Sequence, residues 1–253
     1  MTVDDLQLLI DLHKGGVRQG PGGDAETRLA ITLAGLRGKT DLQIAAVGCG
    51  TGASTLVLAQ ELDAHITALD FLPEFLAILE ANAAQAGVAD RITTLAQSMD
   101  ALPFKAAQLD AIWSEGAIYN MGFEAGIAAW KPFLKPGGIL AVSELTWLTA
   151  ERPAALQAHW DSEYSEVDTA SAKTAILEKH GFSPIGYFAL PEHCWLDHYY
   201  RPLQQRFTAF LDAHGHSEAA KAIVAAEEAE IGLYERHRAF VSYGFYIARK
   251  LAD

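Results

Sequence analysis

The stretch at residues 43–59 constrains the fold most strongly, because it joins a short apolar run, a glycine-rich turn and a helix-forming segment. The run at 44–47 is too short for a helix and is typical of a strand that is buried on both faces. Gly48, Gly50 and Gly52 follow at alternate positions, where the missing Cβ lets the backbone turn sharply and approach a ligand. The helix after the turn offers free N–H groups. We therefore predict that this turn holds a polar cofactor against the end of a strand.

An acidic residue follows at the end of the next apolar run. Residues 65–70 read as a second strand that ends in Asp70, where a carboxylate can accept hydrogen bonds from ribose hydroxyls. Gly48, Gly50 and Ala53 also fit the dinucleotide-binding spacing, with alanine in the last position. NAD and S-adenosylmethionine both contain adenosine, so these two features leave both cofactors open.

Strands and helices continue to alternate after Asp70. The further predicted strands lie at 92–97, 109–113 and 139–143, and a helix lies at 123–133. This alternation predicts right-handed crossovers and a doubly wound, mostly parallel α/β sheet. Ligands of such sheets bind at the carboxyl ends of the strands. Gly48, Asp70, Ser98 and Glu115 all follow predicted strands, so we expect them to share one site.

Composition limits the partners of the chain. It has 253 residues, half of them hydrophobic, which is enough for one large domain or for a core domain with an insertion. The net charge of −13 argues against a nucleic-acid partner or an anionic membrane surface. Cys49 and Cys194 are the only cysteines, so we predict no disulfide framework and a reducing compartment. No apolar run reaches membrane-spanning length, and the acidic N-terminal segment is unlike a signal peptide. We expect a cytoplasmic monomer or homodimer that does not insert into a membrane.

The N-terminal segment combines an amphipathic helix at 3–13 with a glycine-rich loop at 14–23. The loop is either a linker or a flap that orders over a bound ligand. Arg18 and Gln19 favour the flap, because they add polar groups to a loop that precedes the predicted cofactor site. Asp24 is predicted to cap the next helix, which runs to about Leu36.

Five segments resemble known motifs in sequence and in order, and they lie at 47–52, 66–70, 98–104, 109–113 and 133–140. They resemble the S-adenosylmethionine-dependent methyltransferases with the Rossmann-like fold, specifically the small-molecule group related to ubiquinone/menaquinone-biosynthesis methyltransferases. Residues 18–22 and 113–120 resemble a bacterial subgroup of unassigned substrate. Residues 243–249 resemble the antiparallel strand that ends this fold.

The resemblance implies a seven-stranded, mostly parallel sheet with an antiparallel last strand and a helical insertion before it. The implied domains are N-terminal helices with the flap at 1–37, a Rossmann-like cofactor-binding domain at 38–190 and 241–253, and a helical substrate cap at 191–240. It also implies methyl transfer from S-adenosylmethionine to a small-molecule acceptor, with S-adenosylhomocysteine as product. A nicotinamide-dependent oxidoreductase and a catalytically silent S-adenosylmethionine-binding protein remain the alternatives.

The resemblance also implies roles for individual residues. Gly48, Gly50 and Gly52 would pass beneath the methionine part of the cofactor, Asp70 would bind the ribose, and Phe71 would lie against the adenine. The other implied cofactor-binding residues are Cys49, Ser98, Met99, Asp100, Ser114 and Gln19. Glu115, Tyr119 and Asn120 would be the catalytic and acceptor-orienting residues.

One position departs from the family pattern. The acid that usually stands two residues before the first glycine is Ala46 here. We therefore expect cofactor binding that is weakened but not abolished.

The region from 146 to 242 has a different character. Helices are predicted at 154–164 and 171–180 and a strand at 182–190, followed by the helical insertion. We predict a substrate pocket from its aromatic side chains and from the flap arginine, a set that comprises Trp147, Trp195, His198, Tyr199, Tyr200 and Arg18. The alternative is that these rings only attach the insertion to the core.

This region contains two further patterns, an acidic cluster and a group of histidines beside a cysteine. Glu227, Glu228 and Glu230 are predicted to form the solvent-exposed face of a helix. His193 and His198 flank Cys194, but no zinc-ligand spacing is evident, so we predict no metal site. If methyl transfer requires a general base, the candidates are Glu115, His193 and His198.

Overall fold

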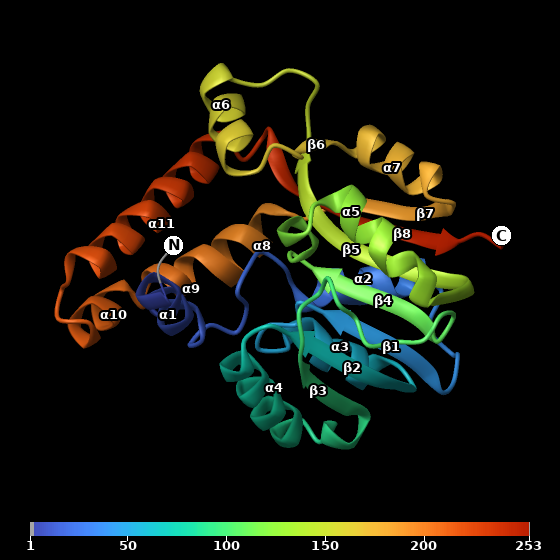
Figure 1. The fold of residues 1–253 in the computed structure, drawn as a ribbon. Coiled ribbons are helices and arrows are strands. Elements are labelled where there is room, and N and C mark those ends of the chain that lie inside the picture. The colour runs from blue at the N-terminus through green and yellow to red at the C-terminus, as the bar shows by residue number, and fades with distance from the viewer. Residues whose placement is uncertain (1–2, 253) are drawn as a thin grey trace.

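One sheet organises the part of the chain that the structure describes, which is residues 3–252 of a computed structural model (Figure 1). Within these residues the sheet has eight strands in the order β3-β2-β1-β4-β5-β8-β7, and β6 pairs with β5 outside this path. The strands are β1 (Leu42–Val47), β2 (Ala64–Asp70), β3 (Ile92–Ala96), β4 (Leu109–Glu115), β5 (Leu134–Trp147), β6 (Asp168–Thr169), β7 (Phe182–Ala189) and β8 (Val241–Lys250).

The pairing confirms the predicted doubly wound α/β class. β1 pairs in parallel with both β2 and β4, whereas β8 is antiparallel to β5 and to β7. The sequence prediction of seven strands omitted β6, a two-residue strand that exists only through its pairing with the end of β5. β5 also extends beyond its predicted end at Ser143, because its ladder with β8 continues to Trp147.

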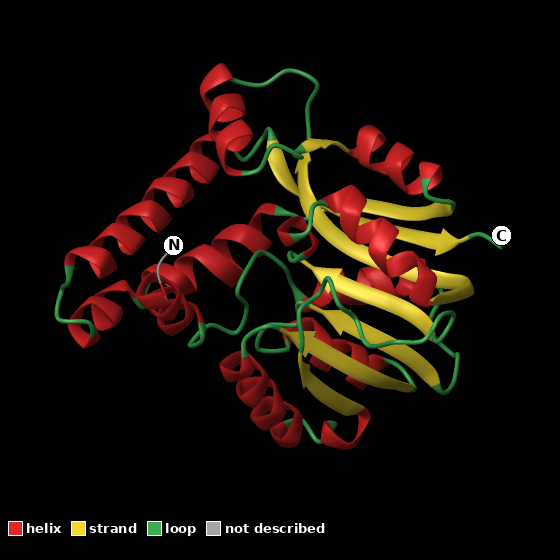
Figure 2. Cartoon of the chain, viewed as in Figure 1, coloured by secondary structure: helices red, strands yellow, loops and turns green. Residues whose placement is uncertain are grey.

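Helices cover both faces of the sheet (Figure 2). The α-helices of the described residues are α1 (Val3–His13), α2 (Asp24–Ala34), α3 (Ala53–Glu61), α4 (Pro73–Gln85), α5 (Phe123–Trp130), α6 (Ala154–Glu163), α7 (Ala170–Lys179), α8 (Glu192–Trp195), α9 (Arg201–Gln204), α10 (Phe207–Ala213) and α11 (Glu218–His237). Side chains of α2, α3 and α4 pack in one core, which includes Ile44 and Ala46. Side chains of α5 and α7 pack in a second core, which includes Ala45 and Val47. β1 is therefore buried on both faces, as its continuous apolar run predicts.

A helical layer lies beyond the carboxyl ends of β1 and β4 (Figure 1). It contains α8 to α11, and α1 packs against α10 and α11. Asp24 is the first residue of α2 rather than its cap, since Gly23 occupies the cap position in an extended conformation. Among the described residues, no helix joins the length and the apolar character that crossing a membrane requires.

Candidate functional site

A cavity of about 490 Å³ lies where the strand order reverses between β1 and β4. We call it the strand-end cavity. Its walls come from the segments that follow β1, β2, β3 and β4, together with residues of α1 and the flap. The volume lies in the range of about 300–1,000 Å³ that is usual for small-molecule sites. The position is the one at which open α/β sheets bind their ligands.

The glycine-rich turn after β1 forms one wall of this cavity. Gly48, Gly50 and Gly52 have φ angles of 66°, 54° and 90°, in the left-handed region that L side chains rarely adopt. A Cβ on Gly50 would lie 2.4 Å from Oε1 of Gln19, and a Cβ on Gly52 would lie 2.1 Å from Cδ1 of Leu79. The turn therefore requires glycine both for its backbone angles and for its close packing.

Asp70 ends β2 beside this turn. Its carboxylate accepts hydrogen bonds from the backbone N–H of Gly50 (2.8 Å) and of Leu72 (3.0 Å), one on each oxygen. Burial raises the pKa of this carboxyl group, and the two N–H donors oppose that shift. Each carboxylate oxygen can accept a second hydrogen bond, so Asp70 retains acceptor capacity on a cavity wall. Burial raises the pKa of the adjacent Cys49 thiol, which leaves that sulfur unreactive.

The flap packs directly on the glycine turn. Oε1 of Gln19 accepts from the backbone N–H of Thr51 (2.9 Å), and its Nε2 donates to the Thr51 hydroxyl oxygen (3.0 Å). Nε2 of Gln19 also donates to the carbonyl of Gly16 (3.0 Å), and the buried Thr51 hydroxyl contacts the carbonyl of Val17 (3.1 Å). The loop at 14–23 is thus a roof over the strand-end cavity and not an open linker.

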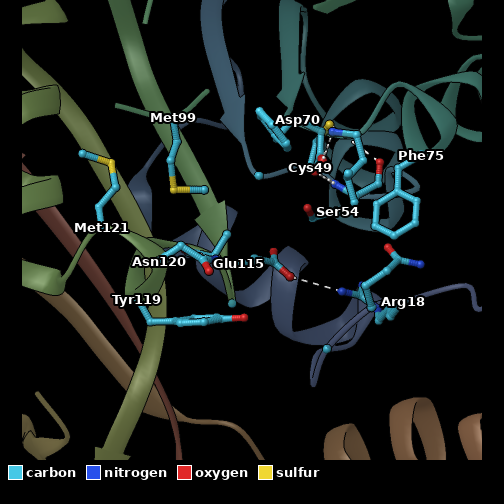
Figure 3. A pocket seen from close by; sticks show the side chains of 18 of the residues that line it. Arg18, Cys49, Ser54, Asp70, Phe75, Met99, Glu115, Tyr119, Asn120 and Met121 are labelled. Atoms are coloured by element: carbon cyan, nitrogen blue, oxygen red, sulfur yellow. Dashed lines mark hydrogen bonds and ion pairs between the residues drawn. The ribbon is translucent and has the colours of Figure 1, made fainter. Parts of the chain in front are cut away.

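A buried ion pair joins the flap to the end of β4. Nη1 of Arg18 lies 3.2 Å from Oε2 of Glu115 (Figure 3), and its Nη2 lies 3.0 Å from the carboxylate of Asp24. The second oxygen of Glu115 accepts from the hydroxyl of Thr27 (2.8 Å) and from Nε1 of Trp113 (2.9 Å). Both oxygens are therefore occupied. The geometry suits Glu115 to holding the flap, and a role as general base would require the flap to release it first.

Most of the residues predicted to bind the cofactor line the strand-end cavity. These are Gln19, Gly48, Cys49, Gly50, Asp70, Phe71, Ser98, Met99 and Asp100, and the predicted catalytic residues Glu115, Tyr119 and Asn120 line it as well. Gly52 and Ser114 do not line it, because both are buried behind the wall. Ala46, the departure from the family pattern, is buried in the core that contains α2 and α3.

Sequence reasoning missed some residues of this cavity. Phe75 and Met121 supply apolar walls on either side of it (Figure 3), and Gln97 adds a polar group at the end of β3. Phe75 lies in the first turn of α4, directly after the Asp70 loop, so its position could have been inferred from that of Asp70. Met121 follows Asn120, so its position could have been inferred from that of Asn120.

A second cavity, of about 700 Å³, adjoins the first, and we call it the cap cavity. The two share a boundary formed by Gln19, Gly20, Pro21, Gly116 and Tyr119. The other walls of the cap cavity come from α6, α8, α11, β5 and β8 and from the turn at Leu196–Tyr200, which contributes Tyr199. Two compartments therefore meet at the end of β4 beneath the flap.

The predicted substrate residues divide between these compartments and the core. Trp195 and Tyr199 line the cap cavity, and Arg18 lines the strand-end cavity. Trp147, His198 and Tyr200 line neither cavity, so their contact with a substrate stays a prediction. Trp147 is buried at the end of β5 among core side chains. Tyr200 is buried and donates its hydroxyl to Glu230 (2.9 Å), while Nδ1 of His198 contacts the carbonyl oxygen of Gly22 (2.8 Å).

The prediction of a solvent-exposed acidic face on α11 was wrong in part. Glu228 is exposed, but Glu227 and Glu230 are partly buried and line the cap cavity. Burial raises the pKa of Glu227 to about 7, with the Glu230 carboxylate adding to the shift. Burial likewise raises the pKa of Glu230, against the hydrogen bond from Tyr200. Both carboxylates therefore stand where charge is costly.

Potential metal ligands gather beside the flap. Donor atoms of His193, Cys194 and His198 lie within 4.8 Å of one another, and Nε2 of His193 lies 3.2 Å from Oε1 of Glu26. The helical turn at Leu196–Tyr200 has π-type bonding, which brings residues five apart onto one face. That the chain has no metal site stays a prediction. It rested on the spacing of these residues in the sequence, which did not include the π-type turn.

Comparison with known proteins supports the resemblance of the sequence motifs to those of methyltransferases. A family model described as a methyltransferase domain matches residues 44–138. An uncharacterised protein of Haemophilus influenzae is 28% identical over 148 residues, which are 57% of this chain and 58% of that protein. The chain spans 23% and 20% of the length of two further curated relatives. It thus covers less than two thirds of each of these proteins.

Solved structures share the fold over nearly the whole chain. The S-adenosylmethionine-dependent methyltransferase of Geobacter sulfurreducens, solved with S-adenosylhomocysteine, has a TM-score of 0.82 at 18% identity and covers 98% of both chains. The [4+2]-cyclase SpnF has a TM-score of 0.76 at 22% identity and covers 98% of this chain and 93% of its own. The predicted Rossmann-like methyltransferase fold is confirmed, and the nicotinamide alternative gains no support.

Proposed function

We propose that this chain, whose residues 44–138 are a methyltransferase domain, transfers a methyl group from S-adenosylmethionine to a small molecule. The observation that carries the proposal is that the strand-end cavity and the cap cavity meet at Gly116 and Tyr119. In this proposal the first holds the cofactor and the second holds the acceptor. We further propose a cytoplasmic location, which the two free cysteines support.

The residues of the strand-end cavity fit an adenosine-containing cofactor. The left-handed glycine turn exposes backbone that a polar ligand can approach closely. Asp70 keeps acceptor capacity for ribose hydroxyls, and the exposed Phe71 ring, with 69% of its surface accessible, offers an apolar face to adenine. Asp100, after β3, supplies an acceptor for the adenine amine. When bound, the sulfonium of the cofactor supplies a methyl carbon that is already activated toward a nucleophile.

The remaining task of the protein is alignment and exclusion of water. The flap, held by Gln19 on Thr51 and by Arg18 on Glu115, closes one side of both cavities. Tyr119 stands at their boundary, where a ring and a hydroxyl can orient an acceptor. Holding two reactants in line under such a roof accounts for a large part of the rate enhancement in direct transfer reactions.

The test is a titration of the full chain with S-adenosylmethionine, S-adenosylhomocysteine and NAD by calorimetry, followed by an acceptor screen with labelled methyl donor. We expect both sulfur compounds to bind and NAD not to bind, and at least one acceptor to become labelled. Binding of NAD alone would overturn the proposal. Binding of the sulfur compounds with no labelled acceptor would favour the catalytically silent alternative.

A further inference from the structure

The cap cavity has an aromatic interior. Six rings line it, contributed by Tyr119, Trp160, Tyr164, Trp195, Tyr199 and Tyr243. The walls are held by their own packing: Trp195 stacks on Tyr234 at 4.4 Å between ring centroids and meets Tyr243 edge-on at 5.0 Å. The indole N–H of Trp160 is buried and has no hydrogen-bond partner among the described residues. The compartment therefore offers ring faces to an occupant.

The charges in this cavity are mostly negative. Glu163, Glu227 and Glu230 line it, and Arg236 is the one arginine or lysine among its described lining residues. Glu227 and Glu230 are three positions apart on α11 and so share a face of the helix. Arg236 lies about 9 Å further along the helix axis than Glu230. Among residues 3–252, no lysine or arginine forms an ion pair with Glu227 or Glu230.

The existing contacts do not neutralise the two carboxylates. Oε1 of Glu227 lies 3.7 Å from Nε2 of His13, but burial lowers the pKa of His13 and so favours its neutral form. Glu230 accepts one hydrogen bond, from the neutral hydroxyl of Tyr200, and His159 on α6 also favours its charged form, although burial outweighs both and raises the pKa of Glu230. Removing a carboxylate from water without a cationic partner is costly. A cation inside the cavity would remove that cost, and the ring faces would add to its attraction.

We propose that the cap cavity binds an organic amine whose protonated nitrogen faces Glu227 and Glu230. The inference rests on the proposed function in treating this cavity as the acceptor compartment, and it narrows the acceptor to a cationic class. An anionic acceptor, such as a phosphate ester or a carboxylate, would meet the three carboxylates of Glu163, Glu227 and Glu230, which disfavours its binding. The proposal concerns the protonated nitrogen as the group that Glu227 and Glu230 recognise, whichever atom receives the methyl group.

The test measures ligand binding to the full chain saturated with S-adenosylhomocysteine. The probes are matched sets of alkyl and aryl compounds, for example 2-phenylethylamine, 2-phenylethanol and 3-phenylpropionate, followed by calorimetry and thermal shift. We expect amines to bind about tenfold or more tightly than the isosteric alcohols, and carboxylates to bind least. If no amine in the panel binds better than its alcohol, the proposal is wrong.

Variants assign the effect to the named carboxylates. Glu227→Gln and Glu230→Gln keep side-chain size and should each weaken amine binding by about tenfold while leaving alcohol binding unchanged. Glu228→Gln, on the exposed side of the same helix, is the matched control and should change neither. Equal amine affinity in all three variants would overturn the assignment. The result is separable from the proposed function, because failure of S-adenosylhomocysteine to bind is read in its own titration of the same protein.

Discussion

The two cavities differ in how their walls are built. The strand-end cavity is made of short segments that each follow a strand, so its main residues lie next to recognisable local patterns. The cap cavity takes its residues from α6, α8, α11 and β8, which are far apart in the chain and join only after packing. The residues of the strand-end cavity can be predicted from spacing in the sequence, whereas those of the cap cavity follow only from the tertiary structure. The difference teaches that cofactor chemistry can be local in sequence while acceptor recognition is not.

The largest expected effect is confined to the strand-end cavity. Asp70→Ala removes the proposed ribose acceptor and leaves the N–H groups of Gly50 and Leu72 without their partner. We expect S-adenosylhomocysteine affinity to fall by about 100-fold, measured by calorimetry. Amine binding in the cap cavity should change less than twofold. Glu74→Ala, exposed in the first turn of α4, is the control and should leave the affinity unchanged. A comparable loss of affinity in that variant would mean that the effect of Asp70→Ala is not specific to Asp70.

A smaller effect should reach both cavities, because the flap roofs them together. Arg18→Gln breaks the buried ion pair and leaves Glu115 without its cation. We expect about tenfold weaker S-adenosylhomocysteine binding and faster amide exchange across residues 14–23, measured by hydrogen–deuterium exchange with mass spectrometry. Adding Glu115→Gln should recover part of the affinity, because no largely buried charge then remains unpaired; the Asp24 carboxylate, which also loses Arg18, is exposed. Unchanged exchange in Arg18→Gln would mean that the ion pair does not hold the flap.

A pH effect should be confined to the cap cavity. Burial raises the pKa of Glu227 to about 7, so this group gains its charge as the pH rises from 6 to 8. The groups that face it are Glu230 on its own helix, His13 on α1 and the Tyr199 ring. Amine affinity should therefore rise by up to about tenfold over this range, and Glu227→Gln should flatten the rise. An equal rise in that variant would assign the titration to another group.

The smallest effect concerns stability. A carboxyl group whose pKa is raised on folding holds its proton more tightly in the folded state, so stability falls as the pH rises from about 4.5 to about 7. Glu227→Gln cannot titrate, so its free energy of unfolding should fall less than that of the parent between pH 4 and pH 8. Urea denaturation at both pH values measures this difference. Glu228→Gln should follow the parent; if Glu227→Gln does so too, the Glu227 carboxylate is not buried in solution.

The differences between the sequence predictions and the structure have physical causes. His198 and Tyr200 were assigned to a pocket because aromatic residues cluster in the sequence, yet a helical turn sends neighbouring side chains to different faces. Trp147 lies at the end of β5, where it is buried among core side chains. Tyr199 lines the cap cavity, whereas the adjacent Tyr200 packs in the core and bonds Glu230. Glu227 and Glu230 seemed exposed because acidic residues usually are. Packing against α1, α6 and the turn at Leu196–Tyr200 encloses them.

The amino-acid sequence by itself determined the doubly wound sheet, the glycine turn and the position of Asp70. These depend on backbone freedom and on residues within one strand, turn and helix, where spacing along the chain translates directly into geometry. Tertiary structure alone decided that Arg18 pairs with Glu115 across 97 positions, and that rings and carboxylates from separate helices share one cavity. Such contacts depend on how whole elements pack, and local patterns do not encode the packing of distant elements.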